Sequence, residues 1–189
     1  PQGKKDAGEP CDLVIGARNT IREFCTFNIG SPGDVGVTRV GDDNWIMAYV
    51  HVAHDCTVGN HTIFANNSTL AGHVEVGDWV ILGGFTGVHQ FVRLGAHSFT
   101  AISSVLVADL PPFVMCQGQP AEARSMNFDG LRRRGFSAER LAAVKALHQR
   151  LDPHGLTLQY ALVRIADLRD KDPEAPLAGR IMLQLFAQP

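Results

Sequence analysis

Charge, aromatic rings and long apolar runs are all scarce in this sequence. Of its 189 residues, 19% are charged and 7% are aromatic. No apolar run approaches the roughly 18 residues needed to cross a bilayer, which excludes a membrane-spanning chain. The formal net charge of -2 argues against a nucleic-acid binder, because phosphate neutralisation needs many clustered Lys and Arg side chains. The 45% apolar content excludes a disordered tail and predicts one sizeable core.

Cysteines are few and widely spaced. The four stand at Cys11, Cys25, Cys56 and Cys116 without a CxxC pair, so neither a zinc knuckle nor a disulfide framework is indicated. The chain opens on Pro1 without an apolar signal segment, and nothing in it predicts export. We expect a cytoplasmic location and a true N-terminus upstream of Pro1.

What the sequence does have is a period of six residues. In steps of six from Val40, eleven of twelve positions are apolar, and the position after each is mostly Gly or Ala. A period of six fits neither a helix nor an alternating strand. It matches the hexapeptide β-helix, in which three short strands form one triangular coil around an aliphatic interior. The sequence predicts an all-β solenoid with small residues where the backbone turns tightly. The apolar positions are Val40, Ile46, Val52, Val58, Phe64, Leu70, Val76, Leu82, Val88, Leu94 and Leu106, and Thr100 is the exception.

The period breaks once before Val40. Ile15, Ile21 and Phe27 keep the same step, but the phase slips by one across a Gly-, Pro- and Asp-containing segment. We therefore expect a loop excursion over residues 30–39, and another near residues 1–10.

The middle of the solenoid is poor in charge. Between Asn44 and Val92 there is no Lys or Arg, and Asp55, Glu75 and Asp78 are the only carboxylates. A solvated surface normally carries more charge, so we expect a partner to cover part of it, most simply in a closed ring of solenoids. A surface coated with Asn, Thr and Ser ladders is the alternative.

The hexads end at Pro111 and Pro112, and the composition then changes. Ser137 and Thr157 are expected to cap two helices, and a third apolar stretch follows over residues 181–186. We therefore predict a β-helix over residues 1–118 and an α-helical domain over residues 119–189. Between residues 121 and 150 seven basic side chains stand against three acidic ones, which indicates an anionic partner or ligand. The run Arg132–Arg134 suits either diphosphate oxygens or a solvated helix end.

Histidine is the residue type that points to chemistry. Of the eight histidines, His51, His54, His61, His73 and His89 stand out within the hexads. Imidazoles in a polar groove act as general bases near neutral pH or as transition-metal ligands, and each can instead cap a turn. The spacing alone leaves these three interpretations open.

Gly72 follows His54 by one full coil of three hexads. It should therefore stack directly on His54, where a backbone N–H could reach a reacting carbonyl as in an oxyanion hole, unless it is only a small corner residue. Asp55 could orient the His54 ring only if the chain bends there, because adjacent side chains of a regular strand point to opposite faces.

Several longer motifs are more diagnostic than the hexads, above all His-x-Ala-His-Asp-Cys and Gly-Leu-x-Arg-Arg-Gly-Phe. With them the chain resembles the acyl-ACP:UDP-N-acetylglucosamine O-acyltransferase family of lipid A biosynthesis. The segments that carry the resemblance are Ala7–Pro10, His51–Asn60, Ala65–Asn67, Leu70–His73, Gly87–Phe91, Gln117–Gly118 and Asn127–Ser137.

The resemblance implies a left-handed parallel β-helix with a helical C-terminal domain, in a homotrimer whose active sites lie between subunits. It implies His54 as the general base that deprotonates the glucosamine 3-hydroxyl for attack on a 3-hydroxyacyl thioester of acyl carrier protein. Asp55 would position His54, the Gly72 N–H would hold the oxyanion, and neither a metal nor another cofactor would be needed. The implied substrate-binding residues are Lys5, His51, His73, His89, Gln90, Ile102, Asn127, Asp129, Arg133 and Arg134.

Three positions depart from the family pattern. Gly3 stands where an Asp contact is expected, Asn28 where His is common, and Ile102 where long-chain members carry Gly. A bulky residue 102 predicts a preference for shorter acyl chains. The alternatives are an N-acyltransferase on a related UDP-glucosamine, a γ carbonic anhydrase-type enzyme with zinc on His51, His54 or His73, and a non-catalytic scaffold.

Overall fold

The computed structural model describes residues 8–151, and side chains up to residue 146. Gly3, Lys5, the helix expected from Thr157 and the apolar stretch at residues 181–186 lie outside the described residues. Among the described helices, none is long and apolar enough to cross a membrane.

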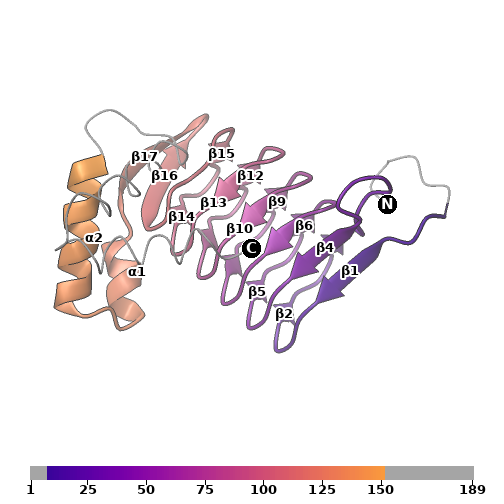
Figure 1. Cartoon of the computed structure of the whole chain (residues 1–189), viewed down its shortest axis with the longest axis horizontal. Coiled ribbons are helices and arrows are strands. Elements are labelled where there is room, and N and C mark those ends of the chain that lie inside the picture. Colours follow the sequence, from indigo (N-terminus) through magenta and orange to yellow (C-terminus); the bar gives the residue numbers. More distant parts are fainter. Residues whose placement is uncertain (1–7, 152–189) are drawn as a thin grey trace.

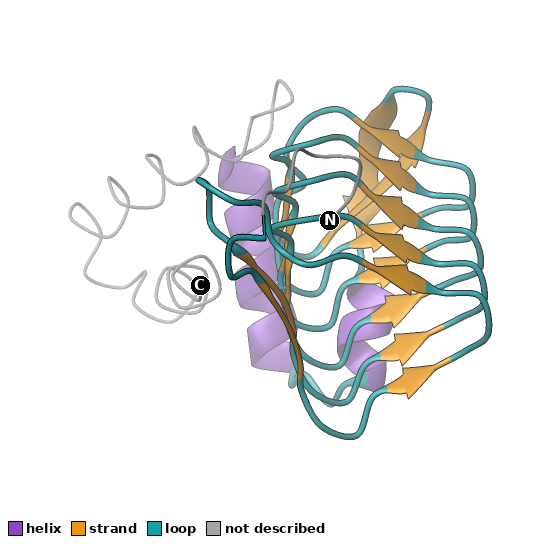
Figure 2. Ribbon diagram, turned by 90° about the vertical axis from the view of Figure 1, so that its right-hand side faces the viewer, coloured by secondary structure: helices purple, strands orange, loops and turns teal. Residues whose placement is uncertain are grey.

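Short parallel strands, most of them two residues long, form a solenoid with three sheets, and the predicted all-β solenoid is confirmed. The first sheet has the order β1-β4-β7-β10-β13, the second β17-β16-β14-β11-β8-β5-β2 and the third β15-β12-β9-β6-β3. Figure 1 shows the coils side by side along the long axis, and Figure 2 shows strands of successive coils stacked in a ladder and joined by turns. The strands are β1 (Asp12–Ile15), β2 (Thr20–Ile21), β3 (Thr26–Phe27), β4 (Val37–Val40), β5 (Trp45–Ile46), β6 (His51–Val52), β7 (Thr57–Val58), β8 (Ile63–Phe64), β9 (Thr69–Leu70), β10 (Glu75–Val76), β11 (Ile81–Leu82), β12 (Gly87–Val88), β13 (Arg93–Leu94), β14 (Phe99–Thr100), β15 (Val105–Leu106), β16 (Val114–Gly118) and β17 (Ala121–Met126).

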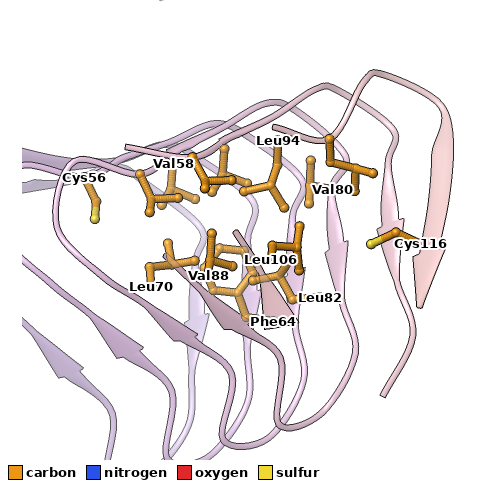
Figure 3. Close-up of a cluster of buried hydrophobic side chains, with 14 of the residues drawn as sticks. Cys56, Val58, Phe64, Leu70, Val80, Leu82, Val88, Leu94, Leu106 and Cys116 are labelled. Atoms are coloured by element: carbon orange, nitrogen blue, oxygen red, sulfur yellow. The ribbon is translucent and has the colours of Figure 1, made fainter. Parts of the chain in front are cut away.

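From β5 to β15 the second residue of each two-residue strand is buried in the interior. Val52 of β6 pairs with Leu70 of β9, and Leu70 pairs with Val88 of β12, so equivalent positions of successive coils stack on one another. The predicted apolar positions from Val40 to Leu106 are at most 4% exposed, and Figure 3 shows seven of them together in the interior: Val58, Phe64, Leu70, Leu82, Val88, Leu94 and Leu106. Full burial of such a side chain contributes roughly 1.5–3 kcal/mol to the free energy of folding. The buried side chains at the six-residue positions are therefore the main source of stability.

The tight turns do not fall on the small residues, contrary to our expectation. In most turns the left-handed φ, between 56° and 66°, falls two residues after the small residue, on a non-glycine residue such as Asp55, His73 or Phe91. The glycines after the buried positions serve the close stacking of coils instead. A Cβ on Gly41 would lie 2.7 Å from the carbonyl oxygen of Gly59 in the next coil.

The predicted loop excursion is present. Ile15 of β1 pairs with Val40 of β4, and Val40 pairs in turn with Val58 of β7, so the first of these two steps uses more of the chain than the second. The extra residues leave the solenoid between β3 and β4, and the Gly30 N–H donates to the carbonyl oxygen of Asp12 at the base of the excursion. We call residues 31–36 the Asp34 loop.

The C-terminal part begins later than predicted. β17 pairs antiparallel with β16 and extends the second sheet to Met126, beyond the expected boundary at residue 118. Two helices follow, α1 (Phe128–Arg133) and α2 (Ala138–Leu151), at the end of the solenoid opposite β1 (Figure 1). The hydroxyl of Ser137 accepts a hydrogen bond from the Arg140 N–H, which confirms the predicted cap of α2.

Candidate active site

The same corner of three successive coils carries the three predicted catalytic residues. It lies between the third and first sheets and holds His54 with Asp55, then Gly72 with His73, then Gln90 with Phe91, at intervals of one coil. The site is therefore a stack of equivalent corners.

His54 and Asp55 form a hydrogen-bonded pair. Asp55 adopts a φ of 60°, so the chain bends as the prediction required, and its carboxylate Oδ2 lies 2.8 Å from His54 Nδ1. The two side chains are 6% and 0% exposed. The His54 ring lies between the Asp55 carboxylate and Gly72 of the next coil, so it is covered at the corner.

The Asp34 loop anchors the Asp55 carboxylate. The backbone N–H of Ser31 lies 2.9 and 3.0 Å from its two oxygens, and the N–H of Gly36 lies 3.0 Å from Oδ1. Burial disfavours the charge, but the hydrogen bonds from Ser31, His54 and Gly36 outweigh it and hold the pKa of Asp55 below its ordinary value. The pair therefore has an ionised carboxylate fixed on Nδ1, which leaves Nε2 as the nitrogen for a substrate proton.

Gly72 packs directly against the His54 ring. A Cβ at residue 72 would lie 2.5 Å from His54 Cε1 and 2.6 Å from Nε2, so only glycine fits, and the predicted stacking of the two residues is confirmed. In the described part of the chain the Gly72 N–H donates to no protein acceptor, while its neighbours Ala71 and His73 donate to the previous or next coil. This N–H is thus available beside the imidazole.

His73 completes the corner. Its ring stacks on Phe91 at 4.7 Å between centroids and meets the His54 ring edge-on at 5.1 Å. Its Nε2 lies 3.2 Å from the Asp34 carboxylate. The sequence did not single out Ser31, Asp34 or Gly36; the predicted excursion was the only signal that this loop existed.

The third sheet and its turns hold the other predicted contacts near this corner. His51 in β6 has its Nδ1 2.6 Å from the Thr26 hydroxyl, and burial lowers its pKa. His89 and Gln90 lie exposed in the turn after β12. Exposed apolar side chains border the same sheet, and we call them the apolar strip: Phe85, Phe91, Ile102, Val105 and Val107, between 38% and 67% exposed.

The predicted nucleotide contacts beyond β17 differ in burial. Asp129 and Arg133 in α1 are exposed, and Asp129 accepts a bond from Arg132 at 2.7 Å. Asn127 is buried, caps α1 by accepting from the Gly130 N–H, and donates to the carbonyl oxygen of His97. Their role as nucleotide contacts stays a prediction.

Arg134 joins α1 to the solenoid. Its guanidinium donates to the carbonyl oxygen of Trp79 at 3.0 Å, lies 5.4 Å from the centre of the Trp79 ring, and is 3.2 Å from His97 Nδ1. His97 stacks between Trp79 and Phe113. Burial, with the charge of Arg134 adding to it, lowers the pKa of His97 to about 4. Arg134 therefore docks the helical part as well as being a predicted phosphate contact.

The donor set His54, Asp55 and His73 also bears on the zinc alternative. One ligand atom from each lies within 4.8 Å of the others. To bind zinc, however, the donors must converge at about 2.0–2.1 Å from one point, whereas Asp55 Oδ2 lies 2.8 Å from His54 Nδ1 as its hydrogen-bond acceptor and 3.8 Å from His73 Nε2. The observed arrangement fits a hydrogen-bonded base more directly than a metal centre.

A hexapeptide solenoid with a carboxylate-anchored histidine at a glycine-lined corner defines a class, the hexapeptide-repeat transferases. A family profile described as "Bacterial transferase hexapeptide (six repeats)" matches residues 38–72, and one described as "Udp N-acetylglucosamine O-acyltransferase; Domain 2" matches residues 109–184. The chain belongs to the UDP-N-acetylglucosamine O-acyltransferase family.

Two relatives illustrate this. The acyl-[acyl-carrier-protein]–UDP-N-acetylglucosamine O-acyltransferase of Albidiferax ferrireducens is 73% identical over 188 residues, covering 100% of this chain and 71% of the relative. The enzyme of the same name from Thiobacillus denitrificans is 62% identical over 92% of this chain and 67% of its own length.

Solved structures agree with the sequence relatives. The Francisella novicida UDP-N-acetylglucosamine acyltransferase matches with a TM-score of 0.84 at 34% identity, covering 97% of this chain and 66% of that one. The UDP-N-acetylglucosamine O-acyltransferase of Moraxella catarrhalis matches with a TM-score of 0.84 at 40% identity, covering 97% of this chain and 72% of that one. The chain thus spans about two thirds to seven tenths of the length of these proteins.

Proposed function

We propose that this chain transfers a 3-hydroxyacyl group from acyl carrier protein to the 3-hydroxyl of UDP-N-acetylglucosamine, the first step of lipid A biosynthesis. The observation that supports this best is the His54–Asp55 pair packed against Gly72, because it combines a base, an anchoring carboxylate and an available N–H at one corner. Family membership at 73% identity supports the choice of substrates.

The arrangement suits acyl transfer by general-base catalysis. His54 Nε2 removes the proton from the sugar 3-hydroxyl while Asp55 holds Nδ1–H and stabilises the imidazolium that forms. The sugar oxygen bonds to the thioester carbonyl carbon, and the Gly72 N–H stabilises the negative oxygen of the tetrahedral intermediate. The carbon–sulfur bond then breaks, and the carrier thiolate takes the proton from His54. The proton taken from the sugar hydroxyl ends on the carrier thiol, so the reaction needs neither a metal nor a covalent enzyme intermediate.

The surroundings suit the two substrates. The apolar strip offers an exposed surface along the third sheet for an acyl chain, because contact with it removes apolar area from water. His51, His73, His89 and Gln90 supply polar atoms for the sugar. Basic side chains of the C-terminal part, including Arg133, suit phosphate groups and an acidic carrier protein.

We further propose a cytoplasmic homotrimer whose active sites lie between subunits. The charge-poor solenoid surface supports it, because solvated surfaces normally carry more charge. The four free cysteines suit a reducing compartment. Light scattering of the purified protein tests the trimer, and a monomer at micromolar concentration would contradict it.

The decisive experiment measures formation of the 3-O-acylated UDP sugar by wild type and His54→Ala. We expect a loss of at least about a hundredfold in kcat, the lower range for a general base, with the folded solenoid retained by circular dichroism although the bond to Asp55 is lost. His61→Ala is the matched control, because His61 is exposed, stacks on Trp79 and lies at a different corner. Full activity of His54→Ala contradicts the proposal, and so does stoichiometric zinc whose removal abolishes turnover.

A further inference from the structure

The Asp34 loop brings a second carboxylate to the site. Asp34 Oδ2 lies 3.2 Å from His73 Nε2, whereas Asp55 Oδ2 lies 3.8 Å from the same nitrogen. The His73 side chain is 10% exposed and that of Asp34 is 49% exposed. A second histidine–carboxylate pair thus stands beside the His54–Asp55 pair, and the proposed chemistry gives Asp34 no part.

The other contacts of His73 do not determine which way its ring is flipped about the Cβ–Cγ bond. Stacking on Phe91, with 15° between the ring planes, and the edge-on contact with His54 fix the plane of the imidazole. Neither contact distinguishes the two orientations related by a half-turn about the Cβ–Cγ bond, because both present a flat ring of the same outline. A negative charge beside one ring nitrogen does distinguish them, because it attracts an N–H and repels a lone pair.

Asp34 places such a charge: its carboxylate Oδ2 lies 3.2 Å from His73 Nε2, as an ion-pair contact without hydrogen-bond alignment. An ionised carboxylate accepts and does not donate, so it favours the form of His73 that carries a proton on Nε2. In the neutral ring this leaves Nδ1 as the nitrogen that can accept a hydrogen bond. The interaction is half-exposed on the carboxylate side, so its expected effect is modest.

We propose that Asp34 is a positioning residue that fixes the flip and the tautomer of His73 and so presents His73 Nδ1 to the bound UDP sugar. The inference rests on the proposed function, in which His73 contacts that substrate. It adds that the loop between β3 and β4 has two separate duties: its backbone holds Asp55, and its one carboxylate directs His73.

The first test does not depend on activity. Nitrogen NMR of histidine-labelled protein, followed up to roughly pH 8 until the His73 signals stop changing, reports which ring nitrogen carries the proton in the neutral form. We expect His73 as the Nε2–H tautomer in wild type and a mixture in Asp34→Ala, with Asp34→Asn closer to wild type because an amide oxygen still accepts. Asp12→Asn is the control, since Asp12 is exposed in β1 at the base of the excursion and removes the same charge. An unchanged His73 signal in Asp34→Ala overturns the proposal.

The second test separates substrate binding from chemistry. Asp34→Ala should raise KM for UDP-N-acetylglucosamine by roughly three- to tenfold, as expected for the loss of a partly exposed ion pair, with kcat within about twofold. In a His73→Ala background, Asp34→Ala should have no further effect. An equal effect in both backgrounds, or a fall in kcat with a lowered melting temperature, overturns the positioning role. A wild type without acyl transfer refutes the proposed function instead, and the NMR result still decides the role of Asp34.

Discussion

Replacing Gly72 by alanine tests the geometry of the site most directly. The added methyl would lie 2.5 Å from His54 Cε1, whereas ordinary contact begins at 3.4 Å, so the ring must move by about 1 Å, a misplacement that costs on the order of a hundredfold in rate. Such a shift also lengthens the 2.8 Å bond between His54 Nδ1 and Asp55. Gly72 has no left-handed φ, so the backbone itself accepts alanine. We therefore expect kcat to fall by about a hundredfold while KM for both substrates changes little.

The assay is acyl transfer from carrier protein to UDP-N-acetylglucosamine, with the melting temperature measured in parallel. Overpacking alone should cost about 1–3 kcal/mol of unfolding free energy. Gly59→Ala is the matched control: its methyl would also overlap the next coil, lying 2.5 Å from an Asp78 oxygen, but away from His54. It should lose similar stability and keep kcat within about twofold. Equal loss of kcat in both variants, or normal kcat in Gly72→Ala, would refute the reasoning.

Three further changes give distinct outcomes. Asp55→Asn should lower kcat by about a hundredfold to ten-thousandfold, because the amide favours the wrong His54 tautomer. The pKa of Asp55 is depressed in the folded state, so the ionised carboxylate stabilises the fold fully above its unfolded pKa of about 4, and this stabilisation is lost as the pH falls through the folded-state pKa. The urea unfolding free energies of wild type and variant should therefore converge in acid. The folded-state pKa of His97, about 4, lies below an unfolded value near 6.5, so the unfolded chain binds more protons between these pH values and stability falls as pH is lowered through that window, by about 3 kcal/mol at most. His97→Phe keeps the stack and should remove this part of the pH dependence in thermal unfolding, and an unchanged slope would contradict the assigned cause. Ile102→Gly should shift the preferred acyl chain to a longer one when carrier-linked chains of several lengths compete, and an unchanged ranking with the longest chain already preferred would contradict the predicted role of Ile102.

The period of six was sufficient to predict the solenoid and its buried positions, because each coil repeats the same local rule and stacks on its neighbour. It also predicted that Gly72 stacks on His54, since that inference needs only the coil length. It misplaced the tight turns, because the left-handed residues, such as Asp55 and Tyr49, share no residue type. It also missed β17, whose residues follow the end of the hexads and join the sheet as an antiparallel edge.

The site was predictable only where its members share one corner. The His54–Asp55 pair and the Gly72–His73 pair are related by one full coil, so the spacing or the family motif finds them. Asp34 reaches His73 from an excursion that has no period, and only coordinates bring them together. Arg134 was predicted from its charge as a phosphate contact, but its contacts with Trp79 and His97 depend on how α1 meets the solenoid, which no local pattern encodes.

The excursion between β3 and β4 also bears on how such an enzyme changes in evolution. The pairing of β1 with β4 spans more of the chain than the pairing of β4 with β7, yet the ladder on either side keeps its register. In a solenoid each coil contacts only the adjacent coils. An inserted segment therefore disturbs little of the solenoid, while its residues reach over the neighbouring coil. Insertions at corners are therefore a low-risk route by which this architecture can acquire new groups above an existing reaction centre.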